Sequence, residues 1–159
     1  MDKLIFGSAA VKLITFAFDG LGLFENHSLS LDLYASDRVV DEVSYAARRM
    51  EGIGNSISSQ TVVAVTGLNA TGKTTILRVT ALAGDIVRGN DITLNNPLYM
   101  PLIPLISDRG VDFRAIFEDN GKWWLLESHF DVRHRDAGMD DAVNEYGTVS
   151  VEFSKEELW

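Results

Sequence analysis

The sequence predicts a single domain of the α/β class, and two observations carry that prediction. The run 61–66, TVVAVT, is apolar and β-branched, and a glycine-bounded loop and a helical period over 74–87 follow it. A continuous apolar run of this kind is typical of a strand covered on both faces. Alternating apolar and polar residues predict two further pairs of antiparallel strands: 11–18 with 29–34, and 111–118 with 122–132.

The remaining segments are interpreted from caps, breakers and turn residues. Ser36 as N-cap and Gly52 as a stop bound a predicted amphipathic helix over 37–51. Asp119, Asn120 and Gly121 predict the turn of a hairpin. Three more segments complete the chain: a Gly/Ser-rich loop over 52–60, an apolar extended connector over 95–106 that holds all 3 prolines, and a short final strand over 148–153.

Length and composition exclude several classes of protein. With 159 residues, 46% hydrophobic and 23% charged, the chain has the composition of a folded domain, which we place over 1–159. The absence of cysteine excludes disulfides and thiolate metal sites. The apolar run after Leu4 is broken by Lys12 and ends at Asp19, too soon for a membrane span or a signal peptide. We therefore expect a cytoplasmic location and no membrane partner.

The charge balance disfavours polyanionic partners. The chain has 14 Lys and Arg against 23 Asp and Glu, a net charge of -9. Such a chain is a poor general ligand for nucleic acid. The acidic excess is concentrated after residue 106, so only the first part leaves room for a local basic groove. His27, His129 and His134, the only histidines, are interpreted as surface residues and not as metal ligands.

Residues 67–74, GLNATGKT, match the phosphate-loop pattern G-x-x-x-x-G-K-[ST] at every fixed position. The glycines let the backbone turn its N–H groups inward around an anion, and the following helix adds its positive end. Lys73 supplies a point charge for the β- and γ-phosphates, and the Thr74 hydroxyl is placed to bind Mg²⁺. The motif predicts binding of ATP and Mg²⁺ through a Walker A loop.

At these residues the chain resembles the ABC-type, AAA-like P-loop ATPase heads of SMC, RecF, overcoming-lysogenization-defect and abortive-infection proteins. The resemblance rests on three stretches: LITFAFDGLGLFENHSLSLDL, GLNATGKTTILRVTALAGDIV and PLIPLISDRGVDFRAIFEDNGKWWLLESHFD. It implies a lobe in which an antiparallel β-meander and a β-hairpin pack beside the phosphate-loop strand. It also implies that Phe24, Glu25 and Asn26, after the first strand, lie near the adenine and ribose.

The chain departs from this family downstream of the phosphate loop. The one candidate for a Walker B strand, WWLLE at 123–127, lacks the aspartate and reads as a hairpin strand that ends in Glu127. A Q-loop glutamine and an LSGG-like signature are missing too. The chain therefore looks like the N-terminal lobe of a larger ATPase head, inactive alone, whose partners are a C-terminal lobe or a second head, as in a homodimer.

The predicted site follows from the motif and the resemblance, and no catalytic residue is assigned. Thr74 is the predicted metal ligand. The predicted nucleotide-binding residues are Gly67, Asn69, Ala70, Thr71, Gly72, Lys73, Thr74, Thr75 and Asn26. Two other functions stay open: a small P-loop kinase, which would need an arginine-rich lid, and a non-catalytic interaction module that binds a partner through its hairpin.

Overall fold

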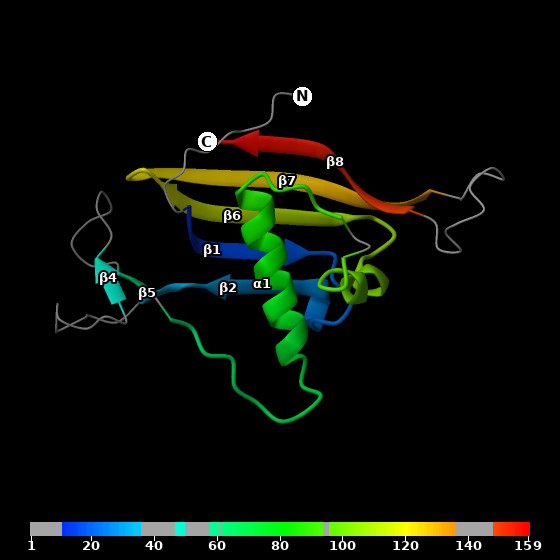
Figure 1. The fold of residues 1–159 in the computed structure, drawn as a ribbon, viewed down its shortest axis with the longest axis horizontal. Helices are drawn as coiled ribbons and strands as arrows, with labels where there is room; N and C mark the ends of the chain where they lie inside the picture. Colours follow the sequence, from blue (N-terminus) through cyan, green and yellow to red (C-terminus); the bar gives the residue numbers. More distant parts are fainter. Residues whose placement is uncertain (1–10, 36–46, 50–57, 61, 94–95, 136–147) are drawn as a thin grey trace.

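The computed structural model describes residues 11–35, 47–49, 58–60, 62–93, 96–135 and 148–159. Its main feature is an antiparallel five-stranded sheet in the order β2-β1-β6-β7-β8, crossed on one face by the helix α1 (Figure 1). The protein is thus an α/β fold in which the sheet is antiparallel. The strands of this sheet are β1 (Lys12–Asp19), β2 (Ser28–Asp32), β6 (Val111–Asp119), β7 (Lys122–Arg135) and β8 (Thr148–Leu158).

The predicted β-meander and β-hairpin are both confirmed. β1 and β2 pair antiparallel, with the short 3₁₀ helix η1 (Glu25–His27) between them. β6 and β7 are joined by Asn120 and Gly121, whose φ angles of 53° and 75° are those of a type I′ hairpin turn. The predicted final strand also forms, and it runs past 153 to Leu158 as β8.

One face of the sheet is buried because apolar residues alternate with polar ones along each strand. Phe16 and Phe18 of β1 pack with Phe113 of β6 and Phe130 of β7. The opposite face carries the polar alternates. The adjacent Trp123 and Trp124 are half-buried, and the β6–β7 register places Trp124 beside the buried Phe117.

The helix α1 (Lys73–Val87) agrees with the predicted helix over 74–87. It closes the buried face with residues of its second half: Val79, Leu82, Ala83, Ile86 and Val87. None of its residues before Val79 is buried, and in Figure 1 the start of α1 extends past the β2 edge of the sheet. The amino-terminal end of this helix is therefore open to a ligand.

The predicted buried strand over 61–66 is wrong. Residues 62–66 belong to no strand, and Val62 and Val63 are 74% and 43% exposed. The physical reason is that a strand requires a neighbour for its backbone hydrogen bonds, and no described strand lies beside this segment. The apolar, β-branched pattern indicates that the segment can form a strand, but no described residue offers a strand for it to pair with.

Three other predictions are corrected in part. Most of the predicted helix 37–51 lies outside the described residues, but β4 (Ala47–Arg49) is a strand because its backbone pairs with β5 (Ser58–Gln60). β5 falls in the predicted loop 52–60, whose other residues also lie outside the described ones, and it pairs with β3 (Tyr34–Ala35). The connector 95–106 is not extended throughout: η2 (Met100–Leu105) is a 3₁₀ helix, which tolerates its prolines.

No helix in the described ranges combines the length and apolar character that a bilayer crossing requires. 

The segment with η2 is attached to α1 by a buried tyrosine. Tyr99 is 2% exposed, and its hydroxyl donates a hydrogen bond to the carboxylate of Asp85 on α1. Asp85 also accepts a hydrogen bond from the side-chain amide of Asn90, at 2.8 Å. Burial, and then the hydrogen bond to Asp85, raise the pKa of Tyr99 above the ordinary value of 10.0.

We expect alkaline pH to weaken this attachment. Because the pKa of Tyr99 is raised on folding, its contribution to the free energy of unfolding is complete below pH 10.0 and is lost as the pH rises above that value. Urea unfolding at about pH 8 and about pH 11 should show a larger loss of stability for the wild type than for Tyr99→Phe. Equal losses for the two proteins would contradict this role of the phenol.

Candidate functional site

The predicted phosphate loop lies between the unpaired segment 62–66 and the start of α1, outside the sheet. Gly67 to Thr71 are exposed, and the helix begins at Lys73. The loop is placed by α1, whose second half is fixed in the core. The loop also lies close to the β1–β2 connection: a Cβ built on Gly72 would lie 3.8 Å from Cδ2 of Leu23.

Lys73 is held over the loop by the loop's own carbonyl groups. Its ammonium donates a hydrogen bond to the carbonyl of Gly67 at 2.8 Å and another to the carbonyl of Leu68. The Thr71 hydroxyl donates to the same Leu68 carbonyl at 2.8 Å. These bonds close the loop into a ring with a positive charge at its mouth.

Two residues of the loop have a left-handed backbone conformation. Ala70 has φ 65° and Gly72, the N-cap of α1, has φ 83°. A left-handed alanine costs roughly 1–2 kcal/mol, and such strain is found mostly at functional sites. No side chain caps the first turn of α1, so its N–H groups remain open to an anion.

The first helical turn carries the other predicted residues. The Thr74 side chain is exposed, and Thr75 is partly buried. Within the described part of the chain, no group of three or more Asp, Glu or His residues could hold a metal ion. The exposed Thr74 hydroxyl offers one oxygen atom, the ligand type that Mg²⁺ prefers.

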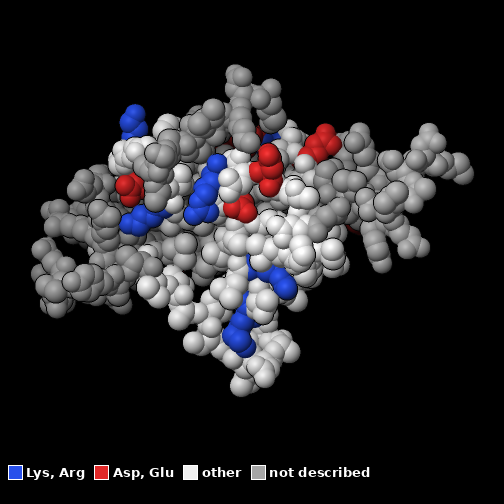
Figure 2. All heavy atoms as spheres, viewed as in Figure 1, with Lys and Arg blue, Asp and Glu red and all other residues white. Residues whose placement is uncertain are grey.

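The surroundings of the loop are locally basic. The first half of α1 carries Lys73 and Arg78 and no acidic residue. Figure 2 shows basic and no acidic atoms on the lower part of this face, although the chain as a whole has a net charge of -9. This local charge favours an anionic ligand at the start of α1.

Asn26, the predicted nucleotide-binding residue outside the loop, belongs to the β1–β2 connection. It lies in η1 with φ 56°, and it lines a hollow of about 520 Å³ together with His27 and Arg109. Leu23 of the same connection lies close to the loop, and the sequence did not single it out. The only sequence feature that could have pointed to Leu23 is its position in the turn after the first strand, two residues before Glu25.

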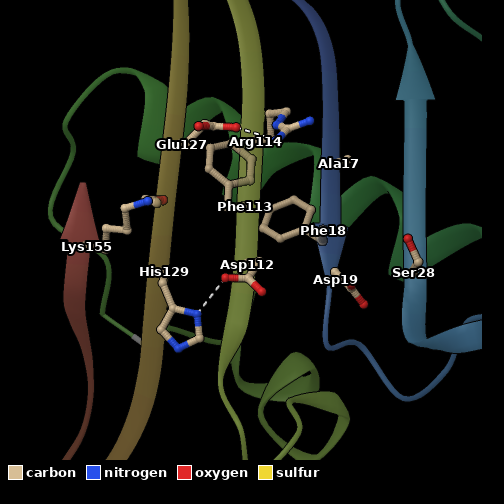
Figure 3. Close-up of a pocket in the computed structure, with 11 residues that line it drawn as sticks. Ala17, Phe18, Asp19, Ser28, Asp112, Phe113, Arg114, Glu127, His129 and Lys155 are labelled. Atoms are coloured by element: carbon tan, nitrogen blue, oxygen red, sulfur yellow. Dashed lines mark hydrogen bonds and ion pairs between the residues drawn. The ribbon is translucent and has the colours of Figure 1, made fainter. Parts of the chain in front are cut away.

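A second polar hollow, of about 510 Å³, lies at the end of the sheet (Figure 3). The Nδ1 atom of His129 lies 2.7 Å from Oδ1 of Asp112, and its Nε2 atom lies 3.7 Å from Oδ1 of Asp131. Asp19 lies opposite Asp112 across β1 and β6. Both carboxylates belong also to the hollow that Asn26 lines, so the two hollows adjoin.

From the sequence, His129 was predicted to be an ordinary surface histidine, and Asp112 was not predicted to belong to any site. The available signal was the turn at Asn120–Gly121, which fixes the hairpin register and so places Asp112 opposite His129. Neither hollow is lined by residues 67–74. The phosphate loop and this polar cluster are thus separate features of the molecule.

Comparison with known proteins adds no relative, since no family model, no curated protein and no solved structure matches the chain.

Proposed function

We propose that the chain binds Mg·ATP through the phosphate loop Gly67–Thr74 and serves as the nucleotide-binding lobe of a larger P-loop ATPase head. The observation that carries the proposal is the ring closed by Lys73, whose ammonium is held at the mouth of the loop by the Gly67 and Leu68 carbonyls. The open N–H groups of the first helical turn add a second anion-binding element at the same place.

Each residue has a distinct task in the proposed complex. The backbone from Asn69 to Gly72 encloses the β-phosphate, and Lys73 neutralises charge on the β- and γ-phosphates. The Thr74 hydroxyl binds the metal ion, which itself offsets phosphate charge when bound. Leu23, which lies close to Gly72, would give the nucleotide an apolar neighbour beside the loop.

The proposed activity is binding, with hydrolysis only in the assembled protein. Hydrolysis requires a residue that orients the attacking water and groups that stabilise charge in the transition state. The one Walker B candidate, Glu127, belongs to β7, and its carboxylate pairs with Arg114. A C-terminal lobe or a second head, as in a homodimer, would have to provide them.

The test is a calorimetric titration of the 159-residue chain with ATP, with and without Mg²⁺, followed by an assay of phosphate release. We expect weak binding that Mg²⁺ strengthens, and almost no turnover. Turnover by verified monomer at about 1–100 per second, the range of kinases, would favour a kinase-like enzyme over a lobe of an ATPase head. Absence of ATP binding at millimolar concentration would reject the proposal.

A further inference from the structure

The hollow of about 510 Å³ at the end of the sheet is lined by side chains of both charges, which the phosphate loop does not use (Figure 3). Asp19 of β1 lies opposite Asp112 of β6. His129 of β7 lies opposite Asp112 on one side and opposite Lys155 of β8 on the other. Arg114 follows two residues after Asp112 on β6. The hollow therefore has two carboxylates on its β1 side and two cations farther along.

The pairing of Asp19 with Asp112 costs stability, because like charges directly opposite each other on neighbouring strands repel. Only Oδ1 of Asp112 is engaged, by Nδ1 of His129 at 2.7 Å, and the Asp112 side chain is 75% exposed. The Asp19 carboxylate makes no hydrogen bond or ion pair with a described residue. A cation bound between the two carboxylates removes their repulsion.

The arrangement of the two carboxylates favours an organic cation. Over the described ranges, no group of three or more Asp, Glu or His side chains could hold a metal ion. A guanidinium carries five N–H donors in a planar fork, which matches carboxylate geometry, whereas an ammonium is a compact point charge. A single guanidinium can therefore donate hydrogen bonds to Asp19 and Asp112 together.

The two cations of the hollow fit a negative group at the other end of the same ligand. Arg114 lies about 7 Å from Asp112 along β6, and Lys155 lies two strands away, at about 10 Å. An extended arginine molecule separates its guanidinium from its carboxylate by a comparable length. Arg114 pairs with Glu127, and the Lys155 ammonium lies 3.4 Å from a carboxylate oxygen of Glu157. Pairs of exposed charges contribute little to stability, so either cation can turn to a ligand.

We propose that this hollow binds a small ligand with a guanidinium at one end and a carboxylate at the other, the chemistry of free arginine or of an arginine that ends a peptide. Asp19 and Asp112 bind the guanidinium, and Lys155 binds the carboxylate. His129 holds Asp112 in position through the hydrogen bond to Oδ1. The proposal does not depend on nucleotide binding, since none of residues 67–74 lines the hollow.

Calorimetric titration of the 159-residue chain with L-arginine at low salt tests the site. Citrulline, which is neutral where arginine carries its guanidinium, and agmatine, which lacks the carboxylate, should each bind roughly tenfold or more weakly than arginine, since each loses a charge-assisted hydrogen bond. N-acetyl-arginine separates the two sources of this chemistry: retained binding assigns the last residue of a peptide, and lost binding assigns the free amino acid.

Three variants assign the two ends of the ligand. Asp112→Asn should weaken arginine and agmatine alike, whereas Lys155→Gln should weaken arginine and leave agmatine unchanged. Asp32→Asn is the matched control, because it removes the same charge from β2 outside the hollow and keeps an oxygen that can accept the Thr15 hydrogen bond. Absence of arginine binding at millimolar concentration, equal binding of citrulline, or a loss with Asp32→Asn as large as with Asp112→Asn would overturn the proposal.

Discussion

Replacement of Lys73 by alanine is expected to weaken the binding of ATP roughly ten- to a hundredfold while leaving adenosine binding unchanged. In the proposed complex the ammonium would make charge-assisted hydrogen bonds with phosphate oxygens, and the loss of such a bond costs about 1.5–3 kcal/mol. Adenosine has no phosphate and loses nothing. Calorimetric titration of both ligands into Lys73→Ala measures the two effects separately.

The chain offers a matched control for this variant. Arg78 lies on the same helix and carries the same charge, but it is outside the phosphate-loop motif. Arg78→Ala should therefore reduce ATP affinity only through the general loss of positive charge, and high salt should remove that smaller effect. If Lys73→Ala weakened ATP and adenosine equally, the variant would have damaged the fold instead of the phosphate site.

Gly110→Ala is expected to reduce the free energy of unfolding by about 2–5 kcal/mol, from backbone strain and overpacking together. Gly110 is buried with φ 78°, a conformation that disfavours alanine. A Cβ there would lie 2.3 Å from Oδ1 of Asp131, 2.8 Å from Nε2 of His129 and 2.8 Å from the carbonyl oxygen of Phe130. The Phe130 carbonyl belongs to the β7 backbone, so relief of the contact must move a strand.

Gly121→Ala separates these two contributions. Gly121 has nearly the same conformation, φ 75°, but a Cβ built there meets no atom within 4 Å. Its replacement should cost only the backbone strain, roughly 1–2 kcal/mol. Urea unfolding of the two variants compares them directly. If both lost the same stability, the close approach of Gly110 to β7 would not limit side-chain size.

The sequence was sufficient for those parts of the fold that local chemistry determines. The hairpin of β6 and β7 was predictable because a two-residue turn and strict alternation both act over a few residues. The helix α1 was predictable because its period and the preceding glycine agree. The pairing of β1 with β6 was not, because it joins residues about a hundred positions apart and leaves no local trace.

The segment 62–66 shows how a correct pattern can give a wrong structure. Its β-branched residues describe what the segment can do when another strand is beside it, but pairing depends on a partner that the pattern cannot name. The residues of the candidate site also fall into those that the sequence predicts and those that it does not. The motif located Lys73 and Thr74, whereas the closeness of Leu23 to Gly72 and of Asp112 to His129 depends on the tertiary arrangement.

The position of β1 in the sheet has a consequence for biosynthesis. β1 and β2 leave the ribosome before β6, but β1 is paired with β6, from Lys12 opposite Glu118 to Asp19 opposite Asp112. At about 5–20 residues per second, β1 waits roughly 5–20 seconds for that neighbour. During this interval Phe16 and Phe18, which are fully covered in the finished sheet, are exposed to solvent on a growing chain. Chains that stop before Glu118 lack the neighbour that covers this edge of β1.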